Sequence, residues 1–276
     1  MIRSLEVKRH LAACFFGAIA VAAAPPAGAA EDMFDGKWHF ALTPYLWLPD
    51  MTGTVTYQNP SGAGGSLTAT ANPTGYLQSL DFAAMFAAEA RKGEVVIFTD
   101  YIYLHLGAND AAVQSVTGPG GNVQVPINLG GSWSVVTNVW TLAAGISVWH
   151  QPEGFLDLFA GMRLLNFSSS IGWNFSGPTS GLANSGSASQ TYNIWDAIVG
   201  LKGQVRLGES DSSWFMPYYA DIGGASNNWT WQAALGVGYH LTWGDAVLLV
   251  RSLSYDVNDK LDLRMTGPVL GVTFKF

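Results

Sequence analysis

A fifteen-residue stretch of alternating character, Trp229–Trp243, constrains the fold more than any other feature of the chain. Its odd-numbered residues, Leu235 among them, are aromatic, aliphatic or alanine, and its even-numbered residues are polar, glycine or alanine. A period of two over this length predicts a β-strand and excludes a helix, whose apolar residues recur every three or four positions. A large apolar face opposite a small or polar face is typical of a barrel strand that contacts lipid.

Composition indicates that such strands face something other than water. Only 12% of the side chains are charged and 49% are hydrophobic, whereas soluble domains usually carry about 25% charged residues. After residue 30, no uninterrupted apolar stretch approaches the roughly 20 residues that a spanning helix requires. A closed barrel is the remaining way to cross a bilayer, because every backbone polar group must find a partner within the protein. We therefore predict an all-β, antiparallel, up-and-down transmembrane β-barrel.

The first thirty residues have the three parts of a secretory signal peptide. Basic residues Arg3, Lys8 and Arg9 precede an apolar run, Leu11–Ala24, and small residues fill positions 27–30. That run has 14 residues, which is too short for a spanning helix of about 20 residues. We expect residues 1–30 to be removed and residues 31–276 to form one outer-membrane barrel domain in a Gram-negative bacterium.

Removal of the signal peptide would also change the charge and the cysteine content. It would take away three basic residues, one acidic residue and the only cysteine, so the formal net charge would change from -7 to -9. The remaining chain can form no disulfide and offers no thiolate ligand. An acidic chain also argues against a nucleic-acid partner.

Turn residues divide the rest of the chain into strands. Tight turns are predicted at 91–94, 151–154, 208–211 and 243–245. Between them lie longer polar connections near 50–78, 108–132 and 174–190, followed by shorter ones near Asn227 and Asn258. Tight and long connections alternate, as they do in up-and-down barrels. The predicted strands, about ten in number, are 37–50, 79–91, 94–107, 133–150, 155–172, 190–206, 213–224, 228–243, 245–256 and 261–276. Twelve strands remain an alternative if residues 52–72 join the wall.

The last strand and four further segments resemble known outer-membrane proteins. Leu270, Val272, Phe274 and Phe276 alternate with smaller or polar residues up to the final aromatic. This pattern looks like the terminal signal that the barrel-assembly machinery recognises. The segments Leu42–Pro49, Phe86–Gly93, Asp100–Leu104, Tyr219–Gly224 and Gly267–Phe276 resemble a family of porin-like proteobacterial outer-membrane proteins. The resemblance implies the fold and the location and supplies no catalytic residues.

The tryptophans are predicted to form two aromatic belts at the two membrane interfaces. Four of them, Trp38, Trp149, Trp214 and Trp243, lie beside the predicted tight turns, and five, Trp47, Trp133, Trp173, Trp229 and Trp231, lie near the longer connections. The core of a water-soluble sandwich would instead place tryptophans in the middle of its strands.

Charged residues within the predicted strands should point into the barrel, because a lipid-facing Arg or Lys at the midplane costs roughly 2 to 4 kcal/mol. The candidates are Glu89, Arg91, Asp100, Asp157, Arg163, Asp196, Lys202, Asp221 and Arg251. They could pair and fill a narrow barrel or line a selective pore. A ten-strand backbone cylinder is roughly 20 Å across, which side chains largely fill, so the filled interior is favoured.

An outer-membrane hydrolase is a further alternative, with rim candidates His105, Asp110, Asp256, Asp259 and Asp262. No nucleophile elbow or zinc-protease motif accompanies them, so we expect no enzyme activity, cofactor or metal. The long connections are rich in Gly, Ser, Thr and Asn and are expected to be solvated. The sequence thus favours a structural or binding barrel that contacts lipid and lipopolysaccharide, with a narrow passive channel as the alternative.

Overall fold

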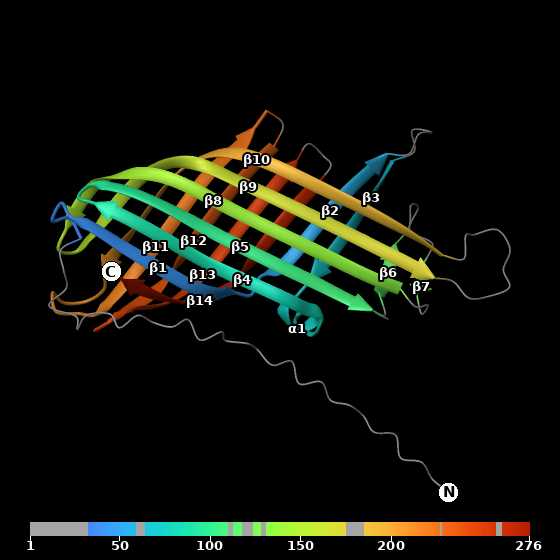
Figure 1. Ribbon diagram of the computed structural model, residues 1–276, viewed down its shortest axis with the longest axis horizontal. Coiled ribbons are helices and arrows are strands. Elements are labelled where there is room, and N and C mark those ends of the chain that lie inside the picture. Colours follow the sequence, from blue (N-terminus) through green and yellow to red (C-terminus); the bar gives the residue numbers. More distant parts are fainter. Residues whose placement is uncertain are drawn as a thin grey trace, which may run out of the picture.

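Ten long strands form a ring in the computed structural model, which describes residues 33–58, 64–109, 113–117, 124–127, 131–174, 185–226, 228–257 and 261–276 (Figure 1). The ring strands are β1 (Trp38–Trp47), β4 (Leu80–Lys92), β5 (Val95–Asn109), β8 (Gly131–Gln151), β9 (Gly154–Asn174), β10 (Ser185–Arg206), β11 (Trp214–Ala225), β12 (Asn228–Leu241), β13 (Gly244–Val257) and β14 (Leu261–Lys275). Each pairs antiparallel with the next, and β1 pairs with β14 to close the ring.

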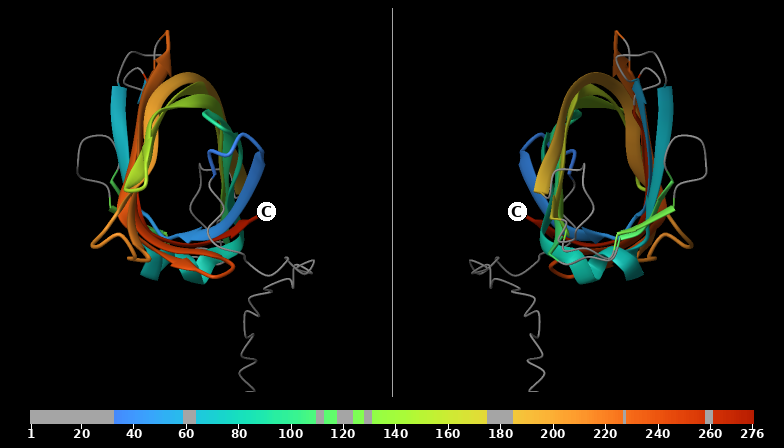
Figure 2. Two further views of the ribbon diagram at one scale, coloured as in Figure 1. Left: turned by 90° about the vertical axis from the view of Figure 1, so that its left-hand side faces the viewer. Right: turned by 90° about the vertical axis from the view of Figure 1, so that its right-hand side faces the viewer.

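The predicted all-β antiparallel barrel of ten strands is confirmed, and every predicted strand limit lies within five residues of the observed one. Viewed along its length, the barrel is oval (Figure 2). The tight connections and both ends of the ring lie at one end, here called the turn end, at the left of Figure 1. The opposite end is called the loop end. Among the described residues, no helix is long and apolar enough to span a bilayer.

Two extra strands attach at the loop end without joining the ring. β2 (Asp50–Gln58) and β3 (Gly64–Ala71) form a hairpin, and β2 pairs with the first half of β14. β1 pairs with the second half of the same strand. This arrangement decides between ten and twelve strands: β2 and β3, which hold the described part of residues 52–72, extend the wall above the ring and do not enlarge it.

Two prolines explain where the pairing of β1 with β4, and then β1 itself, come to an end. Its pairing with β4 ends at Pro44, which has no backbone N–H to continue the ladder. The strand itself ends before Pro49, although the N–H of Leu48 still donates to the carbonyl of Pro268 at 3.0 Å. The first part of β4, before Phe86, therefore has no β1 partner. It follows a short helix, α1 (Pro73–Tyr76), and a 3₁₀ turn, η1 (Leu77–Ser79). The side chain of Asn72 caps α1 by accepting from the N–H of Gly75 at 2.9 Å.

A second, small hairpin lies near the loop end. It consists of β6 (Val113–Thr117) and β7 (Gln124–Ile127), which pair with each other in a separate sheet. It belongs to the connection between β5 and β8, so the ring order is unaffected.

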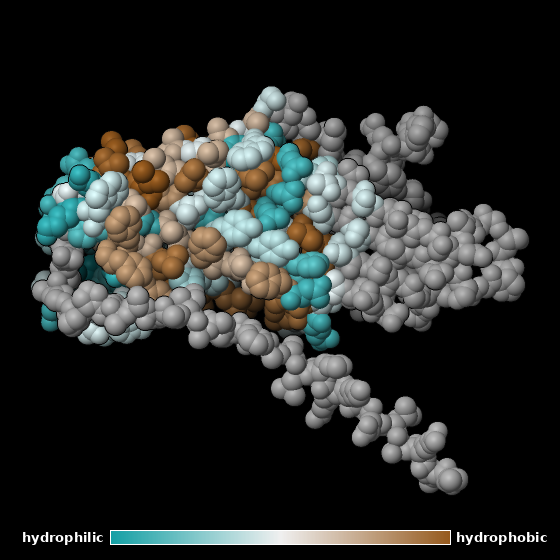
Figure 3. Space-filling view, viewed as in Figure 1, coloured by the Kyte–Doolittle hydropathy of each residue, from teal (hydrophilic) through white to brown (hydrophobic). Residues whose placement is uncertain are grey.

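The alternating pattern of β12 produces the expected two faces. Leu235 is 54% exposed on the outside, whereas Thr230 and Gln232 on the inside are 0% and 6% exposed. Figure 3 shows hydrophobic side chains over the middle of the barrel, between hydrophilic ones at the turn end and a hydrophilic stretch toward the loop end. This face of the exterior therefore carries an apolar band flanked by polar rims.

The inward face of β12 also carries glycines that make room for large neighbours. A Cβ placed on Gly238 would lie 2.2 Å from Cζ of Phe215, a ring that is 3% exposed. We predict that Gly238→Val lowers the free energy of unfolding by about 1 to 3 kcal/mol, because the added methyl groups overpack the interior. The measurement is the urea midpoint of the protein folded into lipid vesicles.

The matched control is Ala233→Val on the exposed face of the same strand. It should leave the midpoint unchanged within error. Equal midpoints for wild type and Gly238→Val would contradict the inward packing of Phe215.

Candidate functional site

The interior at the turn end holds a network of charges from three strands. Arg91 of β4 makes a two-pronged ion pair with Asp157 of β9, and its Nη1 also donates to Oγ of Ser147 at 2.7 Å. Arg91 and Asp157 are 2% and 0% exposed. Glu89 accepts from Nε of Arg91 at 3.2 Å and from the ammonium of Lys202 on β10. The charges are thus paired and hydrogen-bonded, as buried ions must be.

A second pair lies deeper, between β9 and β11. The guanidinium of Arg163 binds both carboxylate oxygens of Asp221, with Nη1 to Oδ1 at 3.0 Å. Two threonine hydroxyls complete its surroundings: Thr141 accepts from Nε at 3.2 Å and Thr230 accepts from Nη1 at 3.4 Å. Both charged side chains are fully buried.

A third pair joins β13 to β5. Arg251 binds the two carboxylate oxygens of Asp100 at 3.0 and 3.2 Å, and its Nη2 donates to Gln232 at 2.8 Å. The hydroxyl of Tyr45 donates to Asp100 at 3.0 Å and accepts from Arg251 at 3.0 Å. The guanidinium also lies 4.9 Å from the ring centre of Trp47, a favourable cation–π distance.

The Arg91–Asp157, Glu89–Lys202 and Arg251–Asp100 pairs cross the interior, whereas the Arg163–Asp221 pair joins strands that are two apart. Around the sheet, β4 and β10 are four strands apart, as are β5 and β13, and β4 and β9 are three apart. Aromatic rings fill the space beside the charges: Phe98 of β5 meets Phe159 of β9 at 4.9 Å and Tyr219 of β11 at 6.3 Å. Side chains therefore cross the lumen in its turn-end half.

The segment before β1 covers the turn-end mouth. The ring of Phe34 stacks on His150 at 4.5 Å, meets Phe155 at 5.9 Å and lies 5.1 Å from the guanidinium carbon of Arg91. Asp35 fixes the neighbouring turn, and its hydrogen bonds to the His39 ring and then to the backbone of Lys37 lower the pKa of its carboxyl. The first residues of the described chain thus close this end further.

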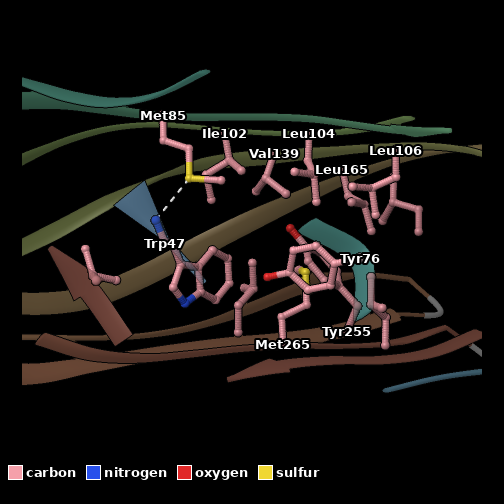
Figure 4. Packing of buried hydrophobic residues seen from close by; sticks show 14 residues of the cluster. Trp47, Tyr76, Met85, Ile102, Leu104, Leu106, Val139, Leu165, Tyr255 and Met265 are labelled. Carbon is pink, nitrogen blue, oxygen red and sulfur yellow. Dashed lines mark hydrogen bonds between the residues drawn. The ribbon is translucent and has the colours of Figure 1, made fainter. Parts of the chain in front are cut away.

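The loop-end half of the interior is apolar instead of charged. A buried cluster there includes Met85, Leu165, Leu253 and Tyr255 and draws side chains from most ring strands. Tyr76 of α1 enters the same cluster, where its hydroxyl donates to the carbonyl of Pro49 at 3.0 Å. Figure 4 shows residues of β4, β5, β8 and β9 facing Trp47, Tyr255, Met265 and Tyr76 across the interior. The two walls pack together as in a soluble protein core.

Trp47 corrects the predicted belt. Its side chain is 2% exposed and packs in this interior cluster, while the neighbouring Leu46 is 45% exposed on the outside. The alternation of β1 therefore directs Trp47 inward, where it meets Arg251. On the exterior, Trp140 and Trp195 lie edge to face with ring centres 6.5 Å apart. The prediction that Trp47 belongs to a lipid-facing belt is wrong.

The other predicted belt tryptophans and the predicted last-strand residues differ in how exposed they are. Trp38, Trp149, Trp214, Trp229 and Trp243 are between 39% and 52% exposed, and Trp231 is half-buried. Trp133 and Trp173 lie in β8 and β9, and their side chains fall outside the described residues. Of the last-strand residues, Leu270 and Phe276 are 61% and 63% exposed, and Val272 and Phe274 are half-buried.

Eight of the nine predicted interior charges are brought into the three pairings described above. The ninth, Asp196, is 2% exposed and accepts from the side-chain amide of Asn228, with no salt-bridge partner among the described residues. Sequence reasoning missed the neutral polar partners Tyr45, Ser147 and Gln232. For Gln232, its place on the polar face of the alternating segment Trp229–Trp243 was the signal that could have identified it. Tyr45 lies in a stretch that is apolar on both faces, and Ser147 lies at a register shift between β8 and β9, so alternation gave no such signal for them.

The rim candidates lie apart from this interior. Asp256 and Asp262 face each other across β13 and β14 and are both exposed. His105 lies on the outward side of β5, with its Nε2 3.2 Å from Oγ of Ser134 and 3.6 Å from Oδ2 of Asp81. Asp110 and Asp259 lie outside the described residues. Within the described chain, no three His, Cys, Asp or Glu side chains are grouped as a metal site would require.

Comparison with known proteins identifies the fold. No protein-family model and no curated protein matches the sequence. The outer membrane protease OmpT from Escherichia coli has a similar structure, with a TM-score of 0.54 and 12% identity over 88% of this chain and 98% of that one. The translocator domain of the autotransporter NalP from Neisseria meningitidis has a TM-score of 0.39, with 16% identity over 88% and 90% of the two chains. At 12% identity, the likeness to OmpT supports the closed antiparallel barrel and nothing beyond the fold.

The Arg163–Asp221 pair gives a test of the interior. We predict that Asp221→Asn lowers the free energy of unfolding by about 3 to 5 kcal/mol, because it leaves a buried guanidinium without its countercharge. Urea titration of the protein in vesicles measures the change.

The matched control replaces both partners, as Arg163→Met with Asp221→Leu. It should recover most of the lost stability, since no uncompensated charge remains. A single variant as stable as wild type would show that the pair is not buried in the folded protein.

Proposed function

We propose that this protein is an integral β-barrel of the bacterial outer membrane whose filled interior does not conduct, and that it serves as a structural or binding barrel. Its exterior supports the location. Large apolar side chains such as Leu235, Val250 and Leu270 are 54%, 60% and 61% exposed, and an apolar band of this kind is stable only against lipid. The turn end would then face the periplasm, and the loop end would face outward.

The interior supports the absence of conduction. The single observation that carries the proposal is the set of Arg–carboxylate pairs that join strands three and four apart in the ring. Above them, Leu165, Leu253 and Tyr255 are all 0% exposed, so no water-sized space adjoins them. An ion crossing the barrel would have to displace both the ion-paired side chains and the apolar side chains above them.

The strands that extend beyond the apolar band support a structural or binding role. β8, β9 and β10 are 21, 21 and 22 residues long, whereas about 9 to 11 residues suffice to cross a bilayer. They extend past the apolar band together with the β2–β3 hairpin. These projecting strands and the connections above them are the surfaces through which we propose that the barrel meets ligands, lipopolysaccharide or other cells.

The location is tested with a charge in the apolar band. Leu235→Arg should lower the free energy of unfolding in vesicles by about 2 to 4 kcal/mol, as expected for an arginine at the bilayer midplane. Ser189→Arg is the matched control, because Ser189 is exposed on the loop-end extension of β10. Equal urea midpoints for the two variants would contradict the embedding of this band in lipid.

The closed interior is tested by single-channel conductance in a planar bilayer. The wild-type protein, shown to be folded by its heat-modifiable migration, should give no discrete steps. The variant Arg163→Gln with Lys202→Gln is recorded beside it. Steady steps from the wild type, with an ion selectivity that shifts in the variant, would overturn the closed barrel in favour of a channel lined by these charges.

A further inference from the structure

Three residues that are common in hydrolases meet on the outside of the barrel near the loop end. Oγ of Ser134 on β8 lies 3.2 Å from Nε2 of His105 on β5, and Oδ2 of Asp81 on β4 lies 3.6 Å from the same nitrogen. Asp81 and His105 are 54% and 33% exposed, so the cluster is open to its surroundings. It lies outside the barrel, apart from the ion pairs of the interior.

A β-bulge brings Asp81 to this face. The pairing of β4 with β5 shifts between Leu80, opposite the buried Leu106, and Phe82, opposite the outward His105. Asp81 is the extra residue between them. Without the bulge, alternation would direct its side chain inward, as it does for Ala83, which packs against the interior cluster. Bulges are frequent beside active sites because they redirect one side chain in this way.

The cluster lies at the edge of the apolar band. Phe82 is 58% exposed, and its ring packs against Tyr103 with 5.8 Å between centres. His105 is ten residues along β5 from Val95 at the turn end, which corresponds to about 25 Å along the membrane normal for a strand tilted by about 40°. The apolar band of such barrels is about 25 Å tall. His105 therefore lies level with the outer boundary of the hydrocarbon, where ester bonds join the acyl chains of lipids to their headgroups.

We propose that Ser134, His105 and Asp81 form a lipid-facing esterase site that hydrolyses acyl esters of outer-leaflet lipids. His105, unprotonated at Nε2, accepts the hydroxyl proton of Ser134 as Oγ attacks the ester carbonyl carbon. The tetrahedral intermediate breaks its bond to the lipid alcohol, which takes the proton from His105, and an acyl-serine remains. Water then attacks this ester and gives a proton to His105. The fatty acid leaves as Oγ regains that proton.

Asp81 acts through His105. Its carboxylate lies on the Nε2 side of the ring, so it stabilises the imidazolium formed in each half of the reaction by charge. It is a positioning residue, whereas Ser134 and His105 are the catalytic residues. The proposal rests on the membrane embedding of the barrel and is independent of whether the lumen conducts.

The test uses the whole protein folded into phospholipid vesicles, with and without lipopolysaccharide in the bilayer, and measures fatty-acid release by mass spectrometry. Wild-type protein should release fatty acid above the rate of empty vesicles. Release from both preparations would identify phospholipid as a substrate, and release only with lipopolysaccharide would identify its acyl esters. A folded, embedded barrel with no release from either would overturn the proposal while leaving the proposed location intact.

Variants assign the activity to the cluster. Ser134→Ala should reduce release to the empty-vesicle rate, and His105→Gln should lower it by about 100-fold or more. Asp81→Asn should lower the rate, and Asp81→Glu should restore part of it, which a purely structural role would not produce. The matched control is Ser252→Ala, which removes a hydroxyl paired with Thr266 on another part of the wall and should leave the rate unchanged.

A covalent probe gives an independent readout. A fluorophosphonate that labels activated serines should modify Ser134 in the wild type, as located by peptide mass spectrometry, and should fail to label this residue in His105→Gln. Unchanged release by Ser134→Ala, or loss of release by Ser252→Ala in a folded barrel, would overturn the assignment.

Discussion

Closure of the ring is the constraint on which the rest of the structure depends. In lipid, which is the environment proposed above, no water satisfies the backbone at the edges of a sheet, so the first and last strands must pair with each other. Here β1 and β14 meet from Ala41 opposite Lys275 to Trp47 opposite Val269, and Phe40 and Phe276 exchange backbone hydrogen bonds at 3.0 and 2.9 Å. The closed ring then fixes which side chains point inward, and both the charged layer and the apolar layer follow from that choice.

The interior of the barrel is filled by two kinds of packing. At the turn end, charges that would be costly against lipid are buried in pairs such as Arg163 with Asp221, where threonine hydroxyls take up the remaining guanidinium donors. At the loop end, Leu165 and Leu253 pack in a cluster of other buried hydrophobic side chains. Both layers span the oval lumen, and two of the strands that they join, β5 and β8, carry the Ser134–His105 pair on their outer faces.

Irregularities in the ladder supply the local features that a regular barrel would lack. Pro44 ends the pairing of β1 with β4, so the first part of β4, which follows α1 and η1 in the chain, has no β1 partner. The bulge at Asp81 lies in this first part of β4, close to the point where the pairing of β1 with β4 ends. A β-sheet edge tolerates an extra residue more readily than a fully paired strand, because fewer hydrogen bonds are disturbed.

The sequence by itself determined the barrel and the inward side of its charges, because a period of two and alternating connection lengths depend only on residues close together in the chain. The choice of ten strands over twelve came from the pairing of β2 with β14 outside the ring. The sequence could not place Trp47, since Tyr45–Trp47 is equally apolar on both faces. The inward position is favoured by the apolar cluster and by Arg251, which other strands bring to this side of β1. The sequence also could not pair Arg91 with Asp157 or bring Asp81 to His105. Those contacts join residues 66 and 24 positions apart, and they depend on ring order, strand register and a bulge, which only the closed tertiary structure decides.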